Sequence, residues 1–347
     1  MKLTKKHLCR LPSCYAVSAL PVVGRLRYLF AADDAGACLS IDAETLATDY
    51  IWDSPGGTMS IVPLPGFDGE FLASRRFLPG FESLHAEIVR VCWRNNRWEI
   101  APWLKLPYVH RFDILERGGV RYFLGCILSS TSGEHADWSC PGYLVAGELN
   151  DRFEAPMELI RIAEGMTHNH GYCRVEKDGF SSALTTCDEG IFEVVPPAQR
   201  DGEWIVRKLL DVPASDVAIV DLDGDGTDEL AVIEPFHGNA FVVYKPIGGV
   251  YREVYRYPYA MDFVHAIWGG KLKGKPVFLC GCRAIHKELF YLEWSDGAIR
   301  EHVIELGYGP SNVHVIHADT EPEILVANRE SGECAVFLVD VDADARE

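Results

Sequence analysis

Four histidines occupy the same position in short apolar segments that recur along the chain. His110, His265 and His314 are each the second residue of a V-H-x-[IF] segment, and His170 takes the matching place in the segment 169–172. Neutral imidazoles that converge on one point suit a divalent transition metal (Mn, Zn, Fe or Ni) better than Ca or Mg. We therefore expect His110, His170, His265 and His314 to be metal ligands at one depth of a shared site. The alternative is a structural ring of histidines, retained by common descent of the segments.

Further polar side chains are expected around the mouth of that site. His237 and His286 follow the second apolar segments of their units at matching positions, in P-F-H-G-N and A-I-H-K-E, and His168 lies two residues before His170. Imidazoles beside a metal-bound substrate can transfer protons, so these three are candidate catalytic acid/base residues. Each of them alone could equally be a solvated loop residue. The candidate substrate-binding residues are Arg76, His135, Tyr172, Trp268 and Arg329.

A second set of candidate ligands lies in the segment D-L-D-G-D-G-T-D-E-L. Asp221, Asp223, Asp225 and Glu229 stand at alternating positions of a loop between two apolar runs, and two glycines allow the turn. Acidic oxygens in this pattern suit Ca²⁺. An EF-hand is excluded because the glutamate that closes it at position 12 is absent and an apolar strand resumes at Leu230. The alternative is an acidic, solvated turn without a tightly bound ion.

The same segment resembles the calcium loop of FG-GAP/VCBS-type propeller repeats. The resemblance implies that Asp221, Asp223, Asp225 and Glu229 supply side-chain ligands and that Thr227 supplies a carbonyl ligand. Together with R-R-F-L-P-G-F-E-S at 75–83, the loop also resembles the propeller part of aldos-2-ulose dehydratase and its bacterial relatives, which act on anhydrofructose-like sugars. The chain lacks that enzyme's cupin portion.

Seven repeated units must position these residues. Each unit has a short apolar strand, a turn and a second apolar strand, and the units are separated by 43, 51, 60, 48, 47 and 49 residues. A four-stranded propeller blade spans roughly 40–50 residues. We therefore expect an all-β, seven-bladed propeller in one domain, 1–347, whose first strands line a central channel and whose last blade is completed by Lys2 to Leu8. The second residues of the first strands are Ala16, Met59, His110, His170, Ala218, His265 and His314.

Charge and cysteine content restrict the partners. The net charge of -18 argues against nucleic acid or an anionic membrane surface. The eleven cysteines form no C-x-x-C pair, which favours reduced thiols and a cytoplasmic location. The basic N-terminus is superficially similar to a signal peptide, but Pro21 and Gly24 interrupt the apolar run that follows it. The sequence indicates no oligomeric state.

The expected chemistry follows from the histidines. A metal held by imidazoles polarises a carbonyl or carboxylate oxygen and acidifies the neighbouring C–H bond. Histidine-lined propellers resemble oligogalacturonate-type lyases, which use this chemistry for elimination. No G-x-G-x-x-G or G-x-S-x-G motif supports hydride transfer or acyl transfer. We expect a metal-dependent carbohydrate lyase, dehydratase or isomerase acting on a small sugar in the channel. The alternative is a non-catalytic propeller that binds a ligand or a protein.

Overall fold

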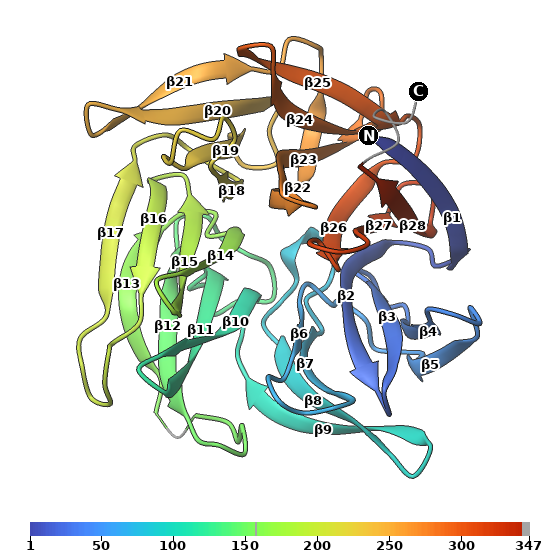
Figure 1. Cartoon of the computed structure of the whole chain (residues 1–347). Coiled ribbons are helices and arrows are strands. Elements are labelled where there is room, and N and C mark those ends of the chain that lie inside the picture. Colours follow the sequence, from blue (N-terminus) through green and yellow to red (C-terminus); the bar gives the residue numbers. More distant parts are fainter. Residues whose placement is uncertain (157, 342–347) are drawn as a thin grey trace.

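A computed structural model describes residues 1–156 and 158–341. Seven antiparallel sheets of four strands each surround a central axis (Figure 1). The helical content of the described residues is the short 3₁₀ helix η1 (Pro79–Phe81), and no helical segment there has the length and hydropathy that a bilayer crossing requires. The predicted all-β, seven-bladed propeller is confirmed.

The first four blades follow one another along the chain, each with its innermost strand first. Their strands are, for blade 1, β2 (Cys14–Val22), β3 (Arg25–Ala32), β4 (Cys38–Asp42) and β5 (Thr48–Trp52); for blade 2, β6 (Ile61–Pro63), β7 (Glu70–Arg75), β8 (Glu87–Arg94) and β9 (Arg97–Lys105); for blade 3, β10 (Val109–Arg117), β11 (Val120–Ser129), β12 (Pro141–Leu149) and β13 (Ile160–Met166); and for blade 4, β14 (Gly171–Lys177), β15 (Phe180–Cys187), β16 (Gly190–Val195) and β17 (Ile205–Leu210).

The last three blades repeat this order, except that blade 7 takes its outer strand from the N-terminus. Their strands are, for blade 5, β18 (Asp216–Val220), β19 (Glu229–Glu234), β20 (Ala240–Ile247) and β21 (Val250–Arg256); for blade 6, β22 (Asp262–Leu272), β23 (Lys275–Ala284), β24 (Leu289–Ser295) and β25 (Ala298–Glu305); and for blade 7, β26 (Pro310–Ile316), β27 (Glu323–Asn328), β28 (Glu333–Asp340) and β1 (Lys2–Arg10).

The N-terminal strand closes the ring, as predicted. β1 pairs antiparallel with β28, from Lys2 opposite Asp340 to Arg10 opposite Glu333, and Figure 1 shows β1 and β28 in the same blade. The Lys5 ammonium lies 2.6 Å from a carboxylate oxygen of Glu305 and 2.6 Å from one of Glu333. The Glu333 contact attaches β1 to β28, and the Glu305 contact attaches it to β25 of blade 6.

The core lies between the blades. The second strand of each blade is packed on both faces by the neighbouring sheets, so strands such as β11 and β23 are buried along most of their length. Outer strands such as β9 and β21 are largely exposed. This layering explains why second strands read in the sequence as continuous apolar runs, whereas fourth strands alternate or are polar.

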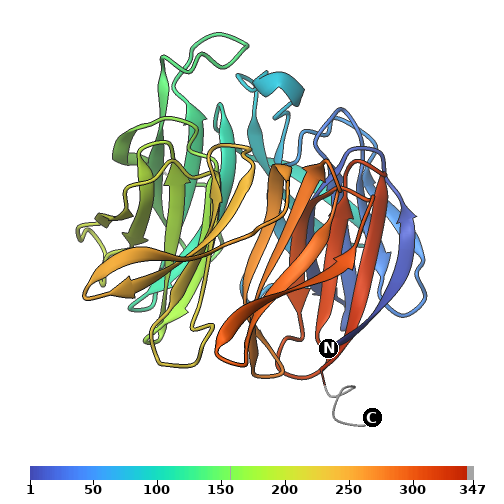
Figure 2. The same ribbon diagram turned by 90° about the horizontal axis from the view of Figure 1, so that it is seen from above.

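Bulges aim side chains into the channel at one end. Four of the first strands carry an irregularity at their beginning, where one extra residue faces a single partner on the second strand. A bulge bends the strand and redirects the extra side chain. η1 projects from this face of the ring, and the N-terminus lies toward the opposite face (Figure 2). The residues at the bulges are Tyr15, His110, His265 and Ser311.

Candidate functional site

Four imidazoles meet at the bulged end of the channel. His110, His170 and His265 belong to blades 3, 4 and 6 and are almost fully buried. His237 reaches the same point from the turn between β19 and β20. The ring centroids of His110 and His170 are 4.2 Å apart, those of His170 and His237 4.8 Å, and those of His170 and His265 5.2 Å. Residues far apart in the sequence therefore form one cluster.

Backbone carbonyls of neighbouring blades fix the tautomer of three of these rings. The Nδ1 atom of His110 lies 3.0 Å from the carbonyl oxygen of His170. The Nδ1 atom of His170 lies 3.1 Å from that of Ser215, and the Nδ1 atom of His265 lies 2.7 Å from that of Ser311. A carbonyl oxygen only accepts hydrogen bonds, so each Nδ1 donates its hydrogen. Each Nε2 atom therefore carries a lone pair that can accept a hydrogen bond or bind a metal.

The residues present fit a divalent metal. The Nε2 atoms of His170 and His237 are 3.2 Å apart, and the ligand atoms of His170, His237 and His265 all lie within 4.8 Å of one another. Tetrahedral Zn–N bonds of about 2.0–2.1 Å place neighbouring ligand nitrogens about 3.3 Å apart. An Nδ1–H that donates to a carbonyl is the usual support of a metal-ligating histidine. Three imidazoles leave an open coordination position, as in catalytic zinc sites.

Burial keeps the cluster neutral. Desolvation holds the pKa of His110, His170 and His265 well below the ordinary histidine value, and lowers the pKa of His237 to about 3. The nearby guanidinium of Arg111 lowers these pKa values further. Imidazoles that stay unprotonated at neutral pH can donate their lone pairs to a metal.

Tyr15 and Arg111 complete the floor of the site. The Tyr15 hydroxyl lies 3.1 Å from Nε2 of His265 and 3.5 Å from Nε2 of His110. Burial raises the pKa of Tyr15 to about 12, so its hydroxyl keeps its proton. Arg111 donates a 2.6 Å hydrogen bond to the carbonyl of Met59 and lies 5.7 Å from the centre of the Tyr15 ring. The floor thus offers one hydroxyl donor beneath a group of neutral acceptors.

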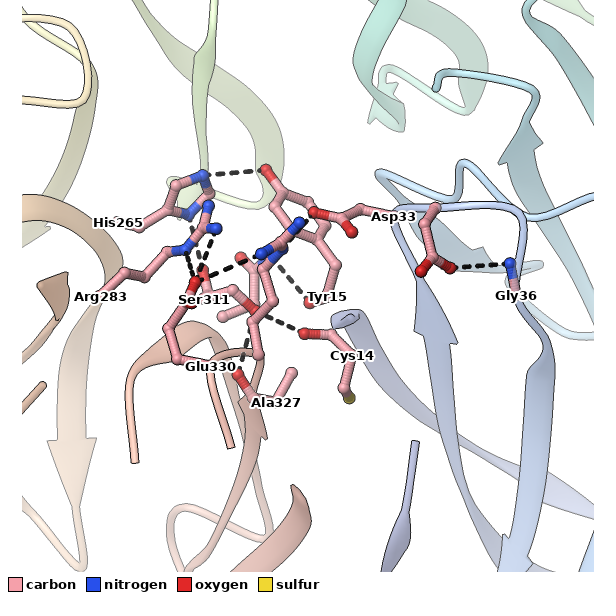
Figure 3. A network of polar contacts seen from close by, with 12 residues as sticks. Cys14, Tyr15, Asp33, Gly36, His265, Arg283, Ser311, Ala327 and Glu330 are labelled. Atoms are coloured by element: carbon pink, nitrogen blue, oxygen red, sulfur yellow. Dashed lines mark hydrogen bonds and ion pairs between the residues drawn. The ribbon is translucent and has the colours of Figure 1, made fainter. Parts of the chain in front are cut away.

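A chain of alternating charges forms the rim on one side (Figure 3). Nε of Arg329 lies 2.5 Å from Oδ2 of Asp33, and its Nη1 lies 3.3 Å from Oε1 of Glu330. Arg283 binds the same Glu330 oxygen at 2.7 Å. Oδ1 of Asp33 is buried and has no hydrogen-bond partner among the described residues, and burial raises the pKa of this carboxyl. The two guanidinium groups of the rim balance its two carboxylates, and Oδ1 of Asp33 is left as an available hydrogen-bond acceptor.

A cavity of about 260 Å³ is lined by three of these imidazoles, by Tyr15, by three rim residues and by three phenylalanines; the imidazoles are His110, His237 and His265, and the rim residues are Asp33, Arg283 and Arg329. Pockets for drug-sized ligands measure roughly 300–1,000 Å³, so this cavity suits a small molecule. The phenylalanines are Phe77, Phe81 and Phe263.

Four of the residues singled out in the sequence line this cavity, and a fifth, His170, contacts them in the imidazole cluster, although not all make the expected contacts. His110, His170 and His265 lie at one depth, as expected. His237 belongs to the imidazole cluster itself rather than to a surrounding set of acid/base groups. Arg329 lies on the rim.

His314 does not join the cluster, and the expectation that it stands at the depth of the other histidines is wrong. In β26 the bulge position belongs to Ser311, so His314 lies three residues further along the channel. It lines a separate cavity of about 550 Å³ toward the opposite end, together with Tyr172 and Trp268. The placement of these two aromatic residues beside the histidines is therefore also wrong. The Tyr172 hydroxyl donates to Asp113 at 2.8 Å.

The remaining candidates lie outside the cavity. Nδ1 of His168 is 2.8 Å from Oδ2 of Asp188, and its ring stacks on Phe236 with centroids 4.1 Å apart. The other three are exposed loop residues. Of these, Arg76 pairs with Glu87 at 3.2 Å, His135 faces Glu82 at 3.4 Å, and His286 lies on the turn between β23 and β24.

Sequence reasoning missed Tyr15, Asp33, Arg283 and Glu330. Tyr15 was missed because it occupies a β-bulge, and no residue pattern in the sequence indicates where a bulge occurs. Asp33 and Glu330 lie at turns between second and third strands, as His237 and Arg329 do, and Arg283 is the penultimate residue of the second strand β23. That shared turn position was the signal that could have found Asp33 and Glu330.

The opposite chamber contains a buried carboxylate, Asp216. Its Oδ1 accepts hydrogen bonds from the backbone N–H groups of Tyr172 (3.2 Å) and Val217 (2.9 Å). Burial raises the pKa of Asp216 to about 6, although Arg111 opposes the shift. Because the folded pKa lies above the unfolded value, this group favours the folded state at low pH, and that contribution is lost as the pH rises toward 6 and beyond.

Asp216→Asn should remove this pH dependence. The amide oxygen can keep both backbone bonds, whereas the wild-type carboxyl must ionise in a buried place. Between about pH 4 and pH 7 the wild type should lose about 2 kcal/mol of unfolding free energy relative to the variant. Urea titrations at both pH values measure this difference. Asp211→Asn, at an exposed position, is the control and should show no such change; a constant difference for Asp216→Asn would contradict the assignment.

The acidic loop lies at the other end of β18 from the histidines. The ligand atoms of Asp221, Asp223 and Asp225 lie within 4.8 Å of one another. Glu229 is buried at the start of β19, and its Oε2 accepts the backbone N–H of Leu222 at 2.7 Å. The loop is therefore remote from the cavity and has no part in its chemistry.

Comparison with known proteins gives the fold. No protein-family model matches the chain, and no curated protein sequence does either. Three similar solved structures are the β-propeller domain of Cps50 (Swd1) from Myceliophteria thermophila (TM-score 0.61, 11% identity, covering 97% of this chain and 100% of that one), a protein from Bacteroides uniformis that is provisionally named a 6-phosphogluconolactonase (0.57, 11%, 88% and 88%), and Sqt1 from Saccharomyces cerevisiae (0.54, 9%, 98% and 98%).

The shared feature is the fold alone. Identities of 9 to 11% carry no information on function, and propellers of one architecture serve unrelated purposes. The function of this propeller must be argued from its own side chains.

Proposed function

We propose that this propeller is a metal-dependent carbohydrate lyase, dehydratase or isomerase that acts on a small sugar in the histidine-lined cavity. One observation carries the proposal: three neutral imidazoles, two of them with Nδ1 fixed by a backbone carbonyl, direct their ligand atoms to within 4.8 Å of one another beside a cavity. Such a donor set suits Mn, Fe, Ni or Zn. His170, His237 and His265 would hold the ion.

Two residues beside the proposed ligands, His110 and Tyr15, are placed to transfer protons. A bound divalent ion would polarise a substrate oxygen and acidify the adjacent C–H bond. His110 is outside the three-imidazole group, and its Nε2 is a neutral acceptor 3.5 Å from the Tyr15 hydroxyl. His110 can accept the proton that leaves carbon, and Tyr15 can donate one to a departing hydroxyl. In dehydration the C–H proton and the neighbouring hydroxyl leave together as water, and in isomerisation the proton moves between adjacent carbons. Neither reaction needs a redox partner.

The rim favours a polyhydroxylated substrate. No donor from the described part of the chain reaches Oδ1 of Asp33, and Arg283 and Arg329 present N–H groups at the same cavity. Because their charges are already balanced by Asp33 and Glu330, hydroxyl groups fit this rim as well as an anion does. The cavity volume of about 260 Å³ favours a monosaccharide-sized molecule over a polymer.

One observation favours the non-catalytic alternative. The Nδ1 atoms of His110, His170 and His265 each bond to the next blade, so these histidines would also stabilise the ring without a metal. A propeller that only binds a ligand or a protein would need nothing more from them. His237 separates the two proposals, because its Nε2 lies 3.2 Å from that of His170 and, among the residues that the structure describes, its ring makes no such bond to a backbone carbonyl.

Metal analysis of purified protein tests the proposal. The wild type should contain about one transition metal ion per chain, and His237→Ala should lose most of it with little change in melting temperature. His286→Ala is the matched control, since His286 occupies the corresponding exposed turn of the next blade; its metal content should equal that of the wild type. Metal-free wild-type protein, after growth and dialysis with each candidate metal, would overturn the proposal in favour of the binder.

Mass spectrometry of small sugars that have been incubated in D₂O with the metal-loaded protein distinguishes the possible reactions. A dehydratase lowers the substrate mass by one water, and an isomerase incorporates deuterium without that loss. His237→Ala should do neither. Metal-loaded protein that leaves every small sugar unchanged would remove the enzyme proposal while keeping the metal site.

A further inference from the structure

A lysine occupies the centre of the acidic loop. Lys245, on β20, places its Nζ atom 2.5 Å from Oδ2 of Asp223, 2.8 Å from Oδ2 of Asp225 and 2.8 Å from Oε1 of Glu229. β19 and β20 pair with Leu230 opposite Tyr244, so the next pair in the same register sets Glu229 beside Lys245. Opposite charges across a strand pair attract, and here the ammonium reaches three carboxylates at once.

Backbone N–H groups take up further oxygens of the loop. Gly226 donates to Oδ2 of Asp221 at 3.0 Å, Thr227 donates to Oδ1 of Asp225 at 2.9 Å, and Asp225 donates to Oδ1 of Asp223 at 3.2 Å. The loop conformation that holds the carboxylates together is thus supported by the chain itself.

The residues present do not fit Ca²⁺ in addition to this lysine. Calcium needs six to eight oxygens at about 2.3–2.6 Å, and the oxygens of Asp223, Asp225 and Glu229 that face one another all contact the Lys245 ammonium. A divalent ion at the same point would meet a positive charge at contact distance. The predicted calcium site, with Thr227 as carbonyl ligand, is therefore not supported by the side chains around it.

We infer that Lys245 is the resident cation of this loop and replaces calcium. The Lys245 side chain is 18% exposed and that of Glu229 is 3% exposed, so the pair is shielded from water and the attraction is stronger than at an open surface. The carboxylates raise the pKa of Lys245 despite its desolvation, which keeps it charged. Blade 5 then holds its shape at any calcium concentration, and the inference does not depend on the function of the histidine cavity.

Replacing Lys245 by an uncharged residue should make the thermal stability of blade 5 depend on calcium. In Lys245→Met the carboxylates remain gathered, and Oδ1 of Asp221, buried and without a hydrogen-bond partner in the described chain, becomes available as an additional ligand. In EDTA this variant should melt about 5 to 10 °C below the wild type, because a shielded carboxylate has lost its partner. Millimolar Ca²⁺ should restore much of that loss, whereas the wild type should melt at the same temperature in EDTA and in Ca²⁺.

Lys177→Met is the matched control. Lys177 makes a single exposed ion pair with Asp228 of the same loop, at 3.0 Å, so its removal should change the melting temperature little and should not introduce a calcium response. Terbium luminescence titrations of the wild type and Lys245→Met measure binding directly, with one site expected in the variant and none in the wild type.

Two results would overturn the inference. The first is stoichiometric terbium or calcium binding by the wild type, which would show that the ion displaces the lysine. The second is a Lys245→Met protein that is as stable as the wild type in EDTA. Should Lys245→Met fail to fold, the wild-type titration decides the question alone, and Lys245→Arg, which keeps the charge, should remain indifferent to calcium.

Discussion

Tyr15→Phe should lower turnover by about 10²- to 10⁴-fold, the usual contribution of a positioned proton donor. The substitution keeps the ring, which packs edge-on against His265 with centroids 5.1 Å apart, and removes only the hydroxyl. Metal content should be unchanged and KM should change little, because Tyr15 is not one of the three proposed ligands. Steady-state kinetics with the sugar identified by mass spectrometry, together with metal analysis, measure these quantities.

Tyr28→Phe is the control for loss of a tyrosine hydroxyl elsewhere. Tyr28 is buried, and its hydroxyl donates to Glu323 at 2.6 Å, away from the cavity. This variant should retain wild-type turnover. Full activity of Tyr15→Phe would show that Tyr15 does not deliver the proton, and a fall in metal content would show instead that the hydroxyl supports the metal ligands.

Deletion of residues 1–10 should prevent stable folding at room temperature. The deletion removes the outer strand of blade 7, which pairs with β28 at eight positions, as well as the ion pairs of Lys5. At about 0.5–1.5 kcal/mol per hydrogen bond the loss is comparable with the roughly 5–15 kcal/mol that stabilises a domain. Circular dichroism during heating should show no cooperative transition, or one displaced by more than about 15 °C.

A synthetic peptide of residues 1–11 should restore the transition when it is added to the truncated protein. The same peptide in scrambled order is the control, because it keeps the charge and loses the register with β28. Cooperative melting of the truncated protein near the wild-type temperature would mean that β1 is dispensable and that the ring is held by contacts between blades alone.

The fold was predictable because it depends on repetition. Buried second strands such as 277–280 and 323–327 recur at blade spacing, and a propeller is the architecture that buries such strands on both faces. Closure by the N-terminal strand followed from the missing fourth strand of the last unit. These features depend on many residues, so a wrong assignment of any single residue does not change the predicted fold.

The site depends on single positions and was harder to predict. Period-2 alternation correctly turned His314 toward the channel, but V-H-x-I in 313–316 was matched to V-H-x-F in 109–112 by apolar pattern alone. The bulges show that Ser311, not His314, corresponds to His110. An extra residue in a strand is a geometric event without a residue signature. For the same reason, the sequence pattern assigns Ala16 rather than Tyr15 to the channel position of the first blade.

The acidic loop illustrates a different limit. A motif of alternating aspartates describes only the groups that follow one another along the chain, whereas Lys245 arrives from the neighbouring strand. Its register is fixed by the pairing of β19 with β20, which becomes known once the sheet is built. Reading the residue opposite Glu229 would have shown that a cation was already present.

The blades that contribute the residues of the site determine how much of the ring must be folded before the site is complete. Tyr15, His110, His170, His237 and His265 come from five of the seven blades. Tyr15 lies in blade 1 and His265 in blade 6, so all five groups meet only when blades 1 to 6 stand together in the ring. The three proposed ligands come from the consecutive blades 4, 5 and 6, so a partly folded molecule that lacked blade 1 would gather the metal ligands without the proposed proton donor.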